Sequence, residues 1–303
     1  MRNFGRVFYL ILGVVMLLSA CAPSDSENNG NSMDSDQGIY GKSLDIDGKF
    51  MNVYEGGKGK RTIVIVPGTE DYSPIQSYTN LVKELEKNYH VVLIEPFGYG
   101  LSDGTDEPRT SENIGDEIHQ AVKTLGIQKY VLLGRSMAGI YALKYVEKYG
   151  NEVEAFVGLD TSTPWMNGGN PIPVEATRLE DIPMIPDVEE EINRQYLDAL
   201  RNNLNNSTRM NEKAAATENL KQAENQKFPE GFKTLQLIAQ ESFDQMEDRR
   251  KDLGVEETWE EQHISLQKDP TDARVKIFPG NSLFYQVSYR EIGEEIHRFL
   301  ENQ

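Results

Sequence analysis

The segment at residues 130–149 constrains the fold of this chain most. Residues 130–133 form a short, continuous apolar run, which is typical of a strand buried on both faces. The run continues into Gly134-Arg135-Ser136-Met137-Ala138-Gly139, and residues 137–149 then have the pattern of a helix. A serine between a buried strand and a helix lies on a sharp turn that exposes its hydroxyl at the carboxyl edge of the sheet. The sequence therefore predicts a parallel sheet with Ser136 at its edge.

Apolar runs and helical patterns alternate along most of the chain. We expect strands at residues 41–47, 50–55, 62–66, 91–94, 130–133, 153–159, 235–239 and 274–278, with a hairpin joining the first two. Helices are expected at residues 75–86, 111–125, 137–149 and 289–300. Strands separated by helix-length connections favour a parallel arrangement. The predicted fold class is α/β, a mostly parallel eight-stranded sheet with helices on both faces.

The alternation is interrupted at residues 164–232. This segment begins with Pro164 and is rich in Asn and Glu. Some of its apolar residues fall at helical spacing: Ile192, Tyr196, Leu200 and Leu204. We therefore expect a helical cap inserted into the sheet domain, which itself spans residues 39–303.

The N-terminus has the pattern of an export signal. Two arginines precede an apolar run at residues 7–18, which is shorter than the roughly 20 residues of a membrane-spanning helix. The run ends in Leu18-Ser19-Ala20-Cys21, which resembles the bacterial lipobox. The resemblance implies a signal peptide at residues 1–20 and a lipidated Cys21. An ordinary secretory signal with an unmodified cysteine is the alternative.

The segment after the cysteine is expected to be a tether. Residues 22–38 contain four acidic residues, no basic residue and almost no apolar one. Such a composition cannot bury a core, so we expect residues 21–38 to be a lipidated cysteine followed by a disordered acidic linker. Two or three acyl chains, palmitate among them, would anchor the protein firmly. The expected location is therefore the cell membrane, with the domain on the extracytoplasmic side.

Composition disfavours several partners. The chain has 49 acidic and 31 basic side chains, a net charge of −18. Such a surface repels phosphate backbones, so we expect no nucleic-acid partner. Four histidines and one cysteine provide neither a disulfide framework nor a cysteine-rich metal site. We expect no metal and no cofactor.

Four segments together resemble the α/β-hydrolase fold family. Residues 133–139 resemble its nucleophile elbow, with Ala138 in place of a usual glycine. Three further segments are similar to family loops: residues 66–69 after the third strand, residues 95–102 after the fourth, and residues 156–160 at the end of the sixth strand before the cap. The resemblance covers residues 39–303 and is weak in the insertion.

The resemblance implies a catalytic serine and an oxyanion hole. Ser136 takes the place of the nucleophile. The backbone N–H of Met137, at the start of the following helix, points where an oxyanion would form. By likeness to the family, the N–H of Thr69 is the second donor, and Pro67 stands where many members carry a histidine.

The acid of the triad has two candidates. Family members place it after the seventh strand or, less often, after the sixth, which points to Glu241 or Asp160 respectively. Asp160 could instead be a strand-end residue that hydrogen-bonds the next turn, and Glu241 a solvated loop charge. Asp244 is a weaker third candidate.

The histidine of the triad is missing from its expected place. Family members carry it between the last strand and the last helix, where this chain has Ser282. A serine does not act as a general base near neutral pH. The histidines that are present are expected to have surface or packing roles: His90, His119, His263 and His297. His263 is the first to examine, because a shifted helix would bring it close.

Two functions follow from this pattern. The elbow implies a membrane-tethered serine hydrolase acting on a small ester, amide or lipid-like substrate through Ser136. Loss of the triad histidine lowers the turnover of subtilisin about a million-fold. If Ser282 is the counterpart of that histidine, then either another base serves Ser136 or the alternative holds, a catalytically degenerate hydrolase fold that binds a ligand or partner in the old pocket. A solute-binding lipoprotein would share the N-terminus but not the elbow or the single insertion.

Overall fold

The computed structural model describes residues 40–302. The predicted signal peptide at residues 1–20, the predicted lipidation site Cys21 and the predicted tether that follows it lie outside the described residues. Among the described residues, no helix combines the length and the apolar character needed to cross a membrane.

The predicted eight-stranded α/β sheet is confirmed. Its spatial order is β1-β2-β4-β3-β5-β6-β7-β8. The pairs β1–β2 and β2–β4 are antiparallel and all other pairs are parallel. The strands are β1 (Lys42–Ile46), β2 (Lys49–Gly56), β3 (Thr62–Val66), β4 (His90–Ile94), β5 (Tyr130–Arg135), β6 (Val153–Leu159), β7 (Thr234–Ala239) and β8 (Ala273–Phe278).

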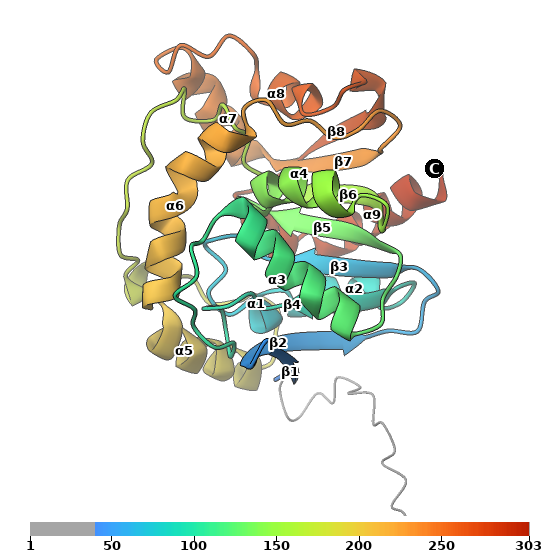
Figure 1. The fold of residues 1–303 in the computed structure, drawn as a ribbon, viewed down its shortest axis with the longest axis vertical. Coiled ribbons are helices and arrows are strands. Elements are labelled where there is room, and N and C mark those ends of the chain that lie inside the picture. Colours follow the sequence, from blue (N-terminus) through green and yellow to red (C-terminus); the bar gives the residue numbers. More distant parts are fainter. Residues whose placement is uncertain (1–39, 303) are drawn as a thin grey trace, which may run out of the picture. The chain divides into compact units, whose positions relative to one another are not determined.

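Helices cover both faces of this sheet. In Figure 1, α3 and α4 lie in front of the strands, and α2 and α9 lie behind them. The helices outside the insertion are α1 (Pro74–Ser77), α2 (Thr79–Leu85), α3 (Ser111–Thr124), α4 (Ala138–Tyr149), α7 (Gln240–Arg250), α8 (Trp259–Ser265) and α9 (Tyr289–Glu301), with 3₁₀ turns η2 (Pro270–Asp272) and η3 (Phe284–Gln286).

The alternating side chains of the strands fill two separate cores. On β3, Val64 and Val66 belong to the core beneath α3 and α4, whereas Ile63 and Ile65 belong to the core beneath α2 and α9. All four are buried, because successive side chains of a strand point to opposite faces and helices cover both. This is the physical reason for the continuous apolar runs in the sequence.

The prediction of a single helix at residues 75–86 is wrong. The chain forms two shorter helices, α1 and α2, with a break at Tyr78. Tyr78 is fully buried, its ring stacks on Tyr285 with centroids 4.4 Å apart, and its hydroxyl donates to Asp71 at 2.8 Å. These contacts involve residues distant in sequence, so helical periodicity gave no sign of the break.

The insertion between β6 and β7 is helical only in its second half. It contains a 3₁₀ turn, η1 (Leu179–Asp181), and two helices, α5 (Glu190–Asn203) and α6 (Ser207–Ala223). The predicted apolar stripe of α5 packs on Tyr72 of the sheet domain and comprises Ile192, Tyr196 and Leu200, with Leu204 partly buried beside them. The part before α5 is otherwise irregular, which the prediction of a helical cap did not specify.

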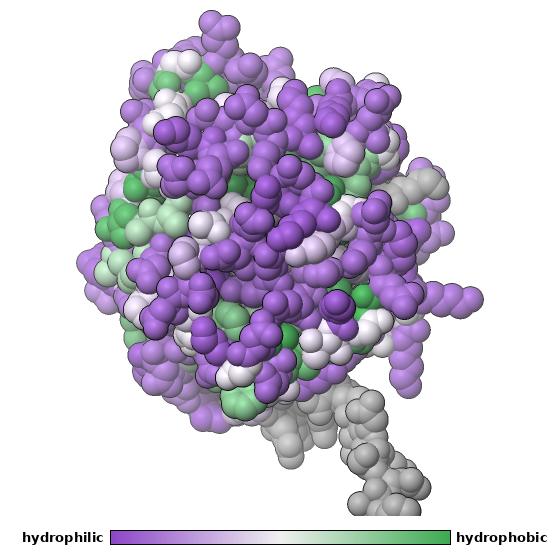
Figure 2. All heavy atoms as spheres, in the orientation of Figure 1, coloured by the Kyte–Doolittle hydropathy of each residue, from purple (hydrophilic) through white to green (hydrophobic). Residues whose placement is uncertain are grey.

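The surface is strongly polar on the face drawn in Figure 2, where hydrophobic residues form small separate groups among hydrophilic ones. This agrees with the net charge of −18. In Figure 1, α5 and α6 cross one end of the strands, so the insertion covers an edge of the sheet.

Candidate active site

The loops that follow β3, β5 and β6 meet at one edge of the sheet. Val66 at the end of β3 pairs with Gly134 of β5, and Arg135 pairs with Leu159 at the end of β6. In the sheet, β4 lies on one side of β3 and β5 lies on the other, so the order of the strands reverses at β3. In open parallel sheets, ligands bind outside the carboxyl ends of the strands at such a point of reversal.

Ser136 lies on a strained turn between β5 and α4. Its φ angle is 51°, a left-handed conformation that non-glycine residues rarely adopt. The turn is held on both sides: the Ser136 carbonyl accepts from the N–H groups of Gly139 and Ser162, both at 3.0 Å, and its own N–H donates to Leu159 at 3.3 Å. The hydroxyl carries no hydrogen bond to another group of residues 40–302. This is the geometry of a strand-to-helix elbow.

Two glycines allow other loops to approach the elbow closely. A Cβ atom on Gly68 would lie 2.8 Å from the Cβ atom of Ser136. A Cβ atom on Gly139 would lie 2.6 Å from that of Thr161. Side chains at either position would push the loops after β3 and β6 away from the serine, so both loops depend on glycine here.

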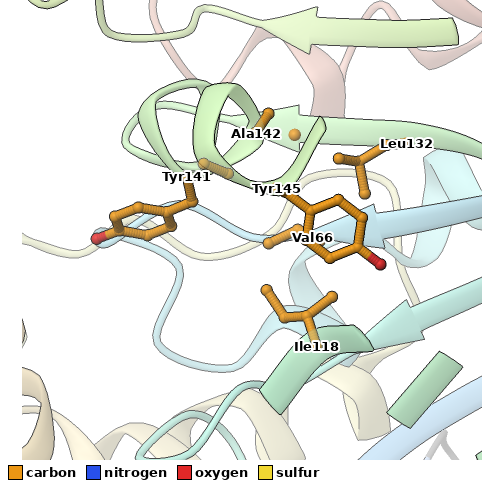
Figure 3. Close-up of a pocket in the computed structure, with 8 residues that line it drawn as sticks. Val66, Ile118, Leu132, Tyr141, Ala142 and Tyr145 are labelled. Atoms are coloured by element: carbon orange, nitrogen blue, oxygen red, sulfur yellow. The ribbon is translucent and has the colours of Figure 1, made fainter. Parts of the chain in front are cut away.

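Ala138, the departure from the family pattern, fits without displacing the elbow. A Cβ atom added to Gly134 would lie 3.1 Å from the methyl of Ala138, so the neighbouring glycine provides the clearance. Behind these two residues is an apolar void of about 10 Å³, lined in Figure 3 by Val66, Leu132 and Ile118 among others. The void is too small for any ligand and too apolar to hold water.

A cavity of about 570 Å³ opens on Ser136. Its floor is formed by the elbow and the loops after β3 and β6, and its walls by the insertion. The lining residues are Thr69, Glu70, Ser136, Met137 and Ser162 from the floor, and Met166, Ile172, Pro173, Glu175, Ala176, Thr177, Asp181, Lys213 and Ala216 from the insertion. The volume lies in the range of small-molecule sites.

The two residues predicted to form the oxyanion hole both line this cavity. Within residues 40–302, neither the N–H of Thr69 nor that of Met137 donates a hydrogen bond to another protein group. Free backbone donors beside a nucleophile are what an oxyanion requires. Their catalytic role stays a prediction.

A buried aspartate that the sequence analysis missed joins the oxyanion loop to the elbow. The carboxylate of Asp71 accepts the Gly68 N–H and the Tyr78 hydroxyl at 2.8 Å each. It also accepts from the Arg135 guanidinium at 2.8 Å and from the Tyr285 hydroxyl at 3.1 Å. Because its carboxylate holds the Gly68 N–H, Asp71 fixes the turn that carries Thr69.

Arg135 connects this aspartate to Ser282, the expected histidine position. Its guanidinium donates to the Ser282 carbonyl at 3.2 Å and lies 3.3 Å from the Ser282 hydroxyl. Burial alone would lower the pKa of Arg135, but Asp71 and Tyr285 raise it above its ordinary value, so the group is a permanent cation. A buried cation therefore stands beside residue 282, and Ser282 does not line the Ser136 cavity.

Asp160 binds the end of the neighbouring strand. One carboxylate oxygen accepts the Ala239 N–H at 3.1 Å and the other accepts the Ser242 hydroxyl at 2.6 Å. Its φ angle is 48°, so the chain turns sharply here. This is the alternative considered for Asp160, a strand-end residue that holds the adjacent turn, and no imidazole bonds to it among the described residues.

Glu241 and Asp244, the candidates for a triad acid after the seventh strand, lie in a helix. Both belong to α7, which starts directly at the end of β7. Both side chains are exposed, and the Asp244 carboxylate accepts from Gln240 at 2.8 Å. The charge of Glu241 is thus solvated, as in the alternative considered for it, but it belongs to a helix and not to a loop.

None of the residues lining the cavity is a histidine. Three of the four histidines bond to side chains elsewhere: His90 to Glu55 at 2.9 Å, His119 to Glu152 at 3.0 Å, and His297 to Tyr89 at 2.9 Å. The expected surface or packing roles agree with these contacts.

His263 lies in α8, before the last strand, and is fully buried. Its ring nitrogens lie 2.8 Å from the Trp259 carbonyl and 3.0 Å from the Thr161 carbonyl. Burial lowers its pKa, although the two carbonyls and Asp160 oppose that effect. Because its two nitrogens face these carbonyls, His263 supports the loop after β6, and it has no hydrogen bond to Ser136.

Among residues 40–302, no group of three or more histidine, cysteine, aspartate or glutamate side chains is arranged to hold a metal ion. The groups that the cavity offers for chemistry include the Ser136 hydroxyl, two backbone donors and the titratable side chains of its lining. Arg135 could have been noticed as a charge at the end of an otherwise apolar strand, whereas Asp71 lies several residues beyond the end of β3.

Comparison with known proteins places these features in a family. Residues 61–245 match the sequence model of the α/β hydrolase fold family. An uncharacterized protein of Bacillus subtilis (strain 168), YbdG, is 30% identical over 125 residues, which are 41% of this chain and 38% of that protein. A 2-hydroxy-6-oxononadienedioate/2-hydroxy-6-oxononatrienedioate hydrolase of Paraburkholderia phymatum is 27% identical over 147 residues, which are 43% of this chain and 50% of the relative. The chain thus spans half or less of the length of these curated relatives.

Solved structures give the same result for the fold. The crystal structure of the epoxide hydrolase VrEH1 from Vigna radiata is similar with a TM-score of 0.66 and 14% sequence identity, over 90% of this chain and all of that one. At this identity the likeness concerns the fold alone. Because the family model covers more than half of the sequence, the chain belongs to the α/β hydrolase fold family, and its eight-stranded, mostly parallel sheet is consistent with that fold.

Proposed function

We propose that this protein is a serine hydrolase that acts through Ser136 on a small ester, amide or lipid-like substrate. One observation carries the proposal: Ser136 has the strained elbow conformation and opens, with Thr69 and Met137, on a cavity of about 570 Å³. Holding a non-glycine residue at such a φ angle costs about 1–3 kcal/mol, which is expected where the geometry serves a function.

The reaction follows from the positions of these groups. The Ser136 oxygen attacks the substrate carbonyl, and the carbonyl oxygen takes up negative charge against the N–H groups of Thr69 and Met137. Collapse of this intermediate expels the alcohol or amine and leaves an acyl group on Ser136. Water then releases the acid. The insertion, which forms most of the cavity wall, selects the substrate.

The test is covalent labelling with a fluorophosphonate probe. Wild-type protein is expected to carry one adduct on Ser136, located by mass spectrometry of the peptide, and Ser136→Ala none. Ser162→Ala is the matched control, because Ser162 lines the same cavity; it should label like the wild type. Absence of an adduct under conditions that label a known serine hydrolase would refute the proposal.

A second candidate function is ligand binding without turnover. It is supported by the lack of histidine in the cavity lining and by the cation beside Ser282. It predicts that Ser136→Ala leaves ligand affinity unchanged and that no product forms over long incubation. Product that appears with the wild type and not with Ser136→Ala would exclude it.

We also propose that Cys21 is lipidated and that the domain is tethered to the outer side of the cell membrane. The support is the lipobox-like ending and the acidic composition of the segment that follows. Growth with a clickable palmitate analogue should label the full chain in the membrane fraction. Cys21→Ser should abolish both the labelling and the membrane association.

A further inference from the structure

A serine nucleophile needs a group that takes its proton, and the cavity wall offers one. Of the residues that line the cavity, Lys213 alone has a basic side chain. The remaining titratable groups of the lining are the carboxylates of Glu70, Glu175 and Asp181, which are exposed. Lys213 is partly buried, so it is the least solvent-exposed of these four titratable side chains.

Helix α6 holds Lys213 beside the oxyanion loop. Arg209, one helical turn earlier on the same face, is buried and donates to the carbonyl of Thr69 and, at 3.4 Å, to that of Asp71. Thr208 bonds to both backbone groups of Thr105, at 2.8 and 3.0 Å. The helix is therefore fixed to the sheet domain, and Lys213 extends over the loop that carries Thr69.

The ammonium of Lys213 is held by neutral oxygens. It lies 2.8 Å from the Thr177 hydroxyl, 3.1 Å from the Glu175 carbonyl and 3.5 Å from the Tyr72 hydroxyl. Within residues 40–302, no carboxylate lies within ion-pair distance of it. A lysine without a carboxylate partner loses its proton more readily than an ion-paired one.

The surroundings of Lys213 lower its pKa below the ordinary lysine value, mainly through burial. Burial lowers the pKa of Lys213, and the nearby Arg209 guanidinium acts in the same direction. The carboxylates of Glu70 and Glu175 oppose this shift but do not reverse it. The Tyr72 hydroxyl that faces the ammonium has its own pKa raised to about 12 by burial, so it stays neutral.

We propose that Lys213 is the general base for Ser136, acting through a water molecule in the open cavity. The proposal rests on Ser136 being the nucleophile. The neutral amine accepts the hydroxyl proton through the water as the serine oxygen bonds to the substrate carbonyl carbon. The resulting ammonium returns the proton to the departing alkoxide or amine, so the lysine ends each acylation step as it began. Deacylation repeats the transfer with water as nucleophile.

The test is the pH dependence of fluorophosphonate labelling, in which the Ser136 oxygen displaces fluoride from phosphorus. For the wild type, the second-order rate constant should rise with pH and then level off. The midpoint of the rise should lie below the ordinary lysine pKa of about 10.4. Lys213→Met should label about 100-fold more slowly and lose this midpoint. Lys221→Met is the matched control, because Lys221 is exposed on the last turn of the same helix; its profile should equal that of the wild type.

A chemical rescue separates a proton acceptor from a structural role. In a Cys21→Ser background, Lys213→Cys treated with bromoethylamine regains an amine of lower pKa than lysine. Labelling should recover with its midpoint moved to lower pH. Labelling of Lys213→Met at the wild-type rate and with the wild-type profile would overturn the proposal for Lys213 and leave Ser136 as the nucleophile. No labelling of the wild type at any pH would overturn both.

Discussion

Asp71→Asn tests whether the oxyanion loop and the elbow form one structural unit. Asp71 is buried, and its two oxygens accept four hydrogen bonds, including one from the Arg135 guanidinium. Asparagine has nearly the same shape, so the substitution removes the charge and one acceptor while creating little empty space. The effect therefore reports on the ion pair and its hydrogen bonds.

The magnitude follows from what is left unpaired. The asparagine carbonyl can still serve Arg135 and Tyr285, and the Tyr78 hydroxyl can turn to accept from the new amide. The Gly68 N–H then faces a donor, and an unsatisfied buried donor costs about 1–3 kcal/mol. The buried guanidinium also loses its counter-ion, and breaking a buried pair typically costs about 3–5 kcal/mol in all. We expect the free energy of unfolding to fall by about 3–5 kcal/mol, a large part of the 5–15 kcal/mol of an ordinary domain.

Urea unfolding followed by circular dichroism measures this loss. Asp198→Asn is the matched control: Asp198 also pairs with an arginine, Arg201 at 3.0 Å, but its side chain is 50% exposed. Its substitution should change the stability by less than about 1 kcal/mol. Replacing both buried charges, as in Asp71→Leu with Arg135→Met, should cost less than Asp71→Leu alone, because no unpaired charge remains.

The reasoning fails if the free energy of unfolding of Asp71→Asn lies within about 1 kcal/mol of the wild-type value, since a loss of that size is typical of exposed ion pairs. It also fails if the two single substitutions, Asp71→Leu and Arg135→Met, add without coupling. Slower labelling of Ser136 in Asp71→Asn, at a temperature where the variant is folded, would show that the Thr69 turn depends on the carboxylate.

Three further outcomes are expected. Ser282→His should not raise activity by the roughly 100-fold that a working general base provides, because a buried guanidinium rather than a carboxylate faces the new imidazole. The rate of p-nitrophenyl acetate hydrolysis measures this. A rise of about 100-fold would contradict the inhibiting effect that we assign to Arg135. Gly100→Ala should destabilise by about 3 kcal/mol and Gly126→Ala by about 1 kcal/mol in thermal unfolding. Both glycines have positive φ, but only the first has an atom, the Glu95 carboxylate, 1.9 Å from the added methyl. Burial lowers the pKa of His263 in the folded chain. Below the ordinary histidine pKa of about 6.5, the unfolded chain therefore binds a proton at this residue that the folded chain does not bind. The free energy of unfolding then falls as the pH drops below about 6.5. His263→Gln should therefore show a smaller loss of urea stability between about pH 7 and pH 5 than the wild type.

The sheet could be predicted because its signal is local. Strands such as β3 and β5 are buried on both faces, and such burial requires a continuous apolar run that is visible in the sequence. Helix α7 was missed for the opposite reason. Only Met246 of its residues is buried, so it has no apolar stripe from which a helix could be inferred.

The elbow could also be predicted, because it depends on consecutive residues. The network around it could not. The Asp71–Arg135 pair joins positions 64 residues apart, and the Tyr285 hydroxyl reaches the same carboxylate from 214 residues away. No periodicity relates such positions. A charged residue inside an otherwise apolar strand end, as at Arg135, was the one local sign that a buried partner exists.

This network decides from which side Ser136 can receive a base. The loop after β8, which carries the histidine in the resembling family, reaches the elbow here through the guanidinium of Arg135. The guanidinium is bound on its other side to Asp71, so an imidazole introduced at residue 282 would meet a cation that disfavours its protonated form. The floor of the cavity offers the hydroxyl of Ser162 and the exposed carboxylate of Glu70, but no amine and no imidazole. The proton acceptor that we propose, Lys213, comes instead from the insertion, and in that proposal α6 is part of the reaction site as well as part of the cavity wall.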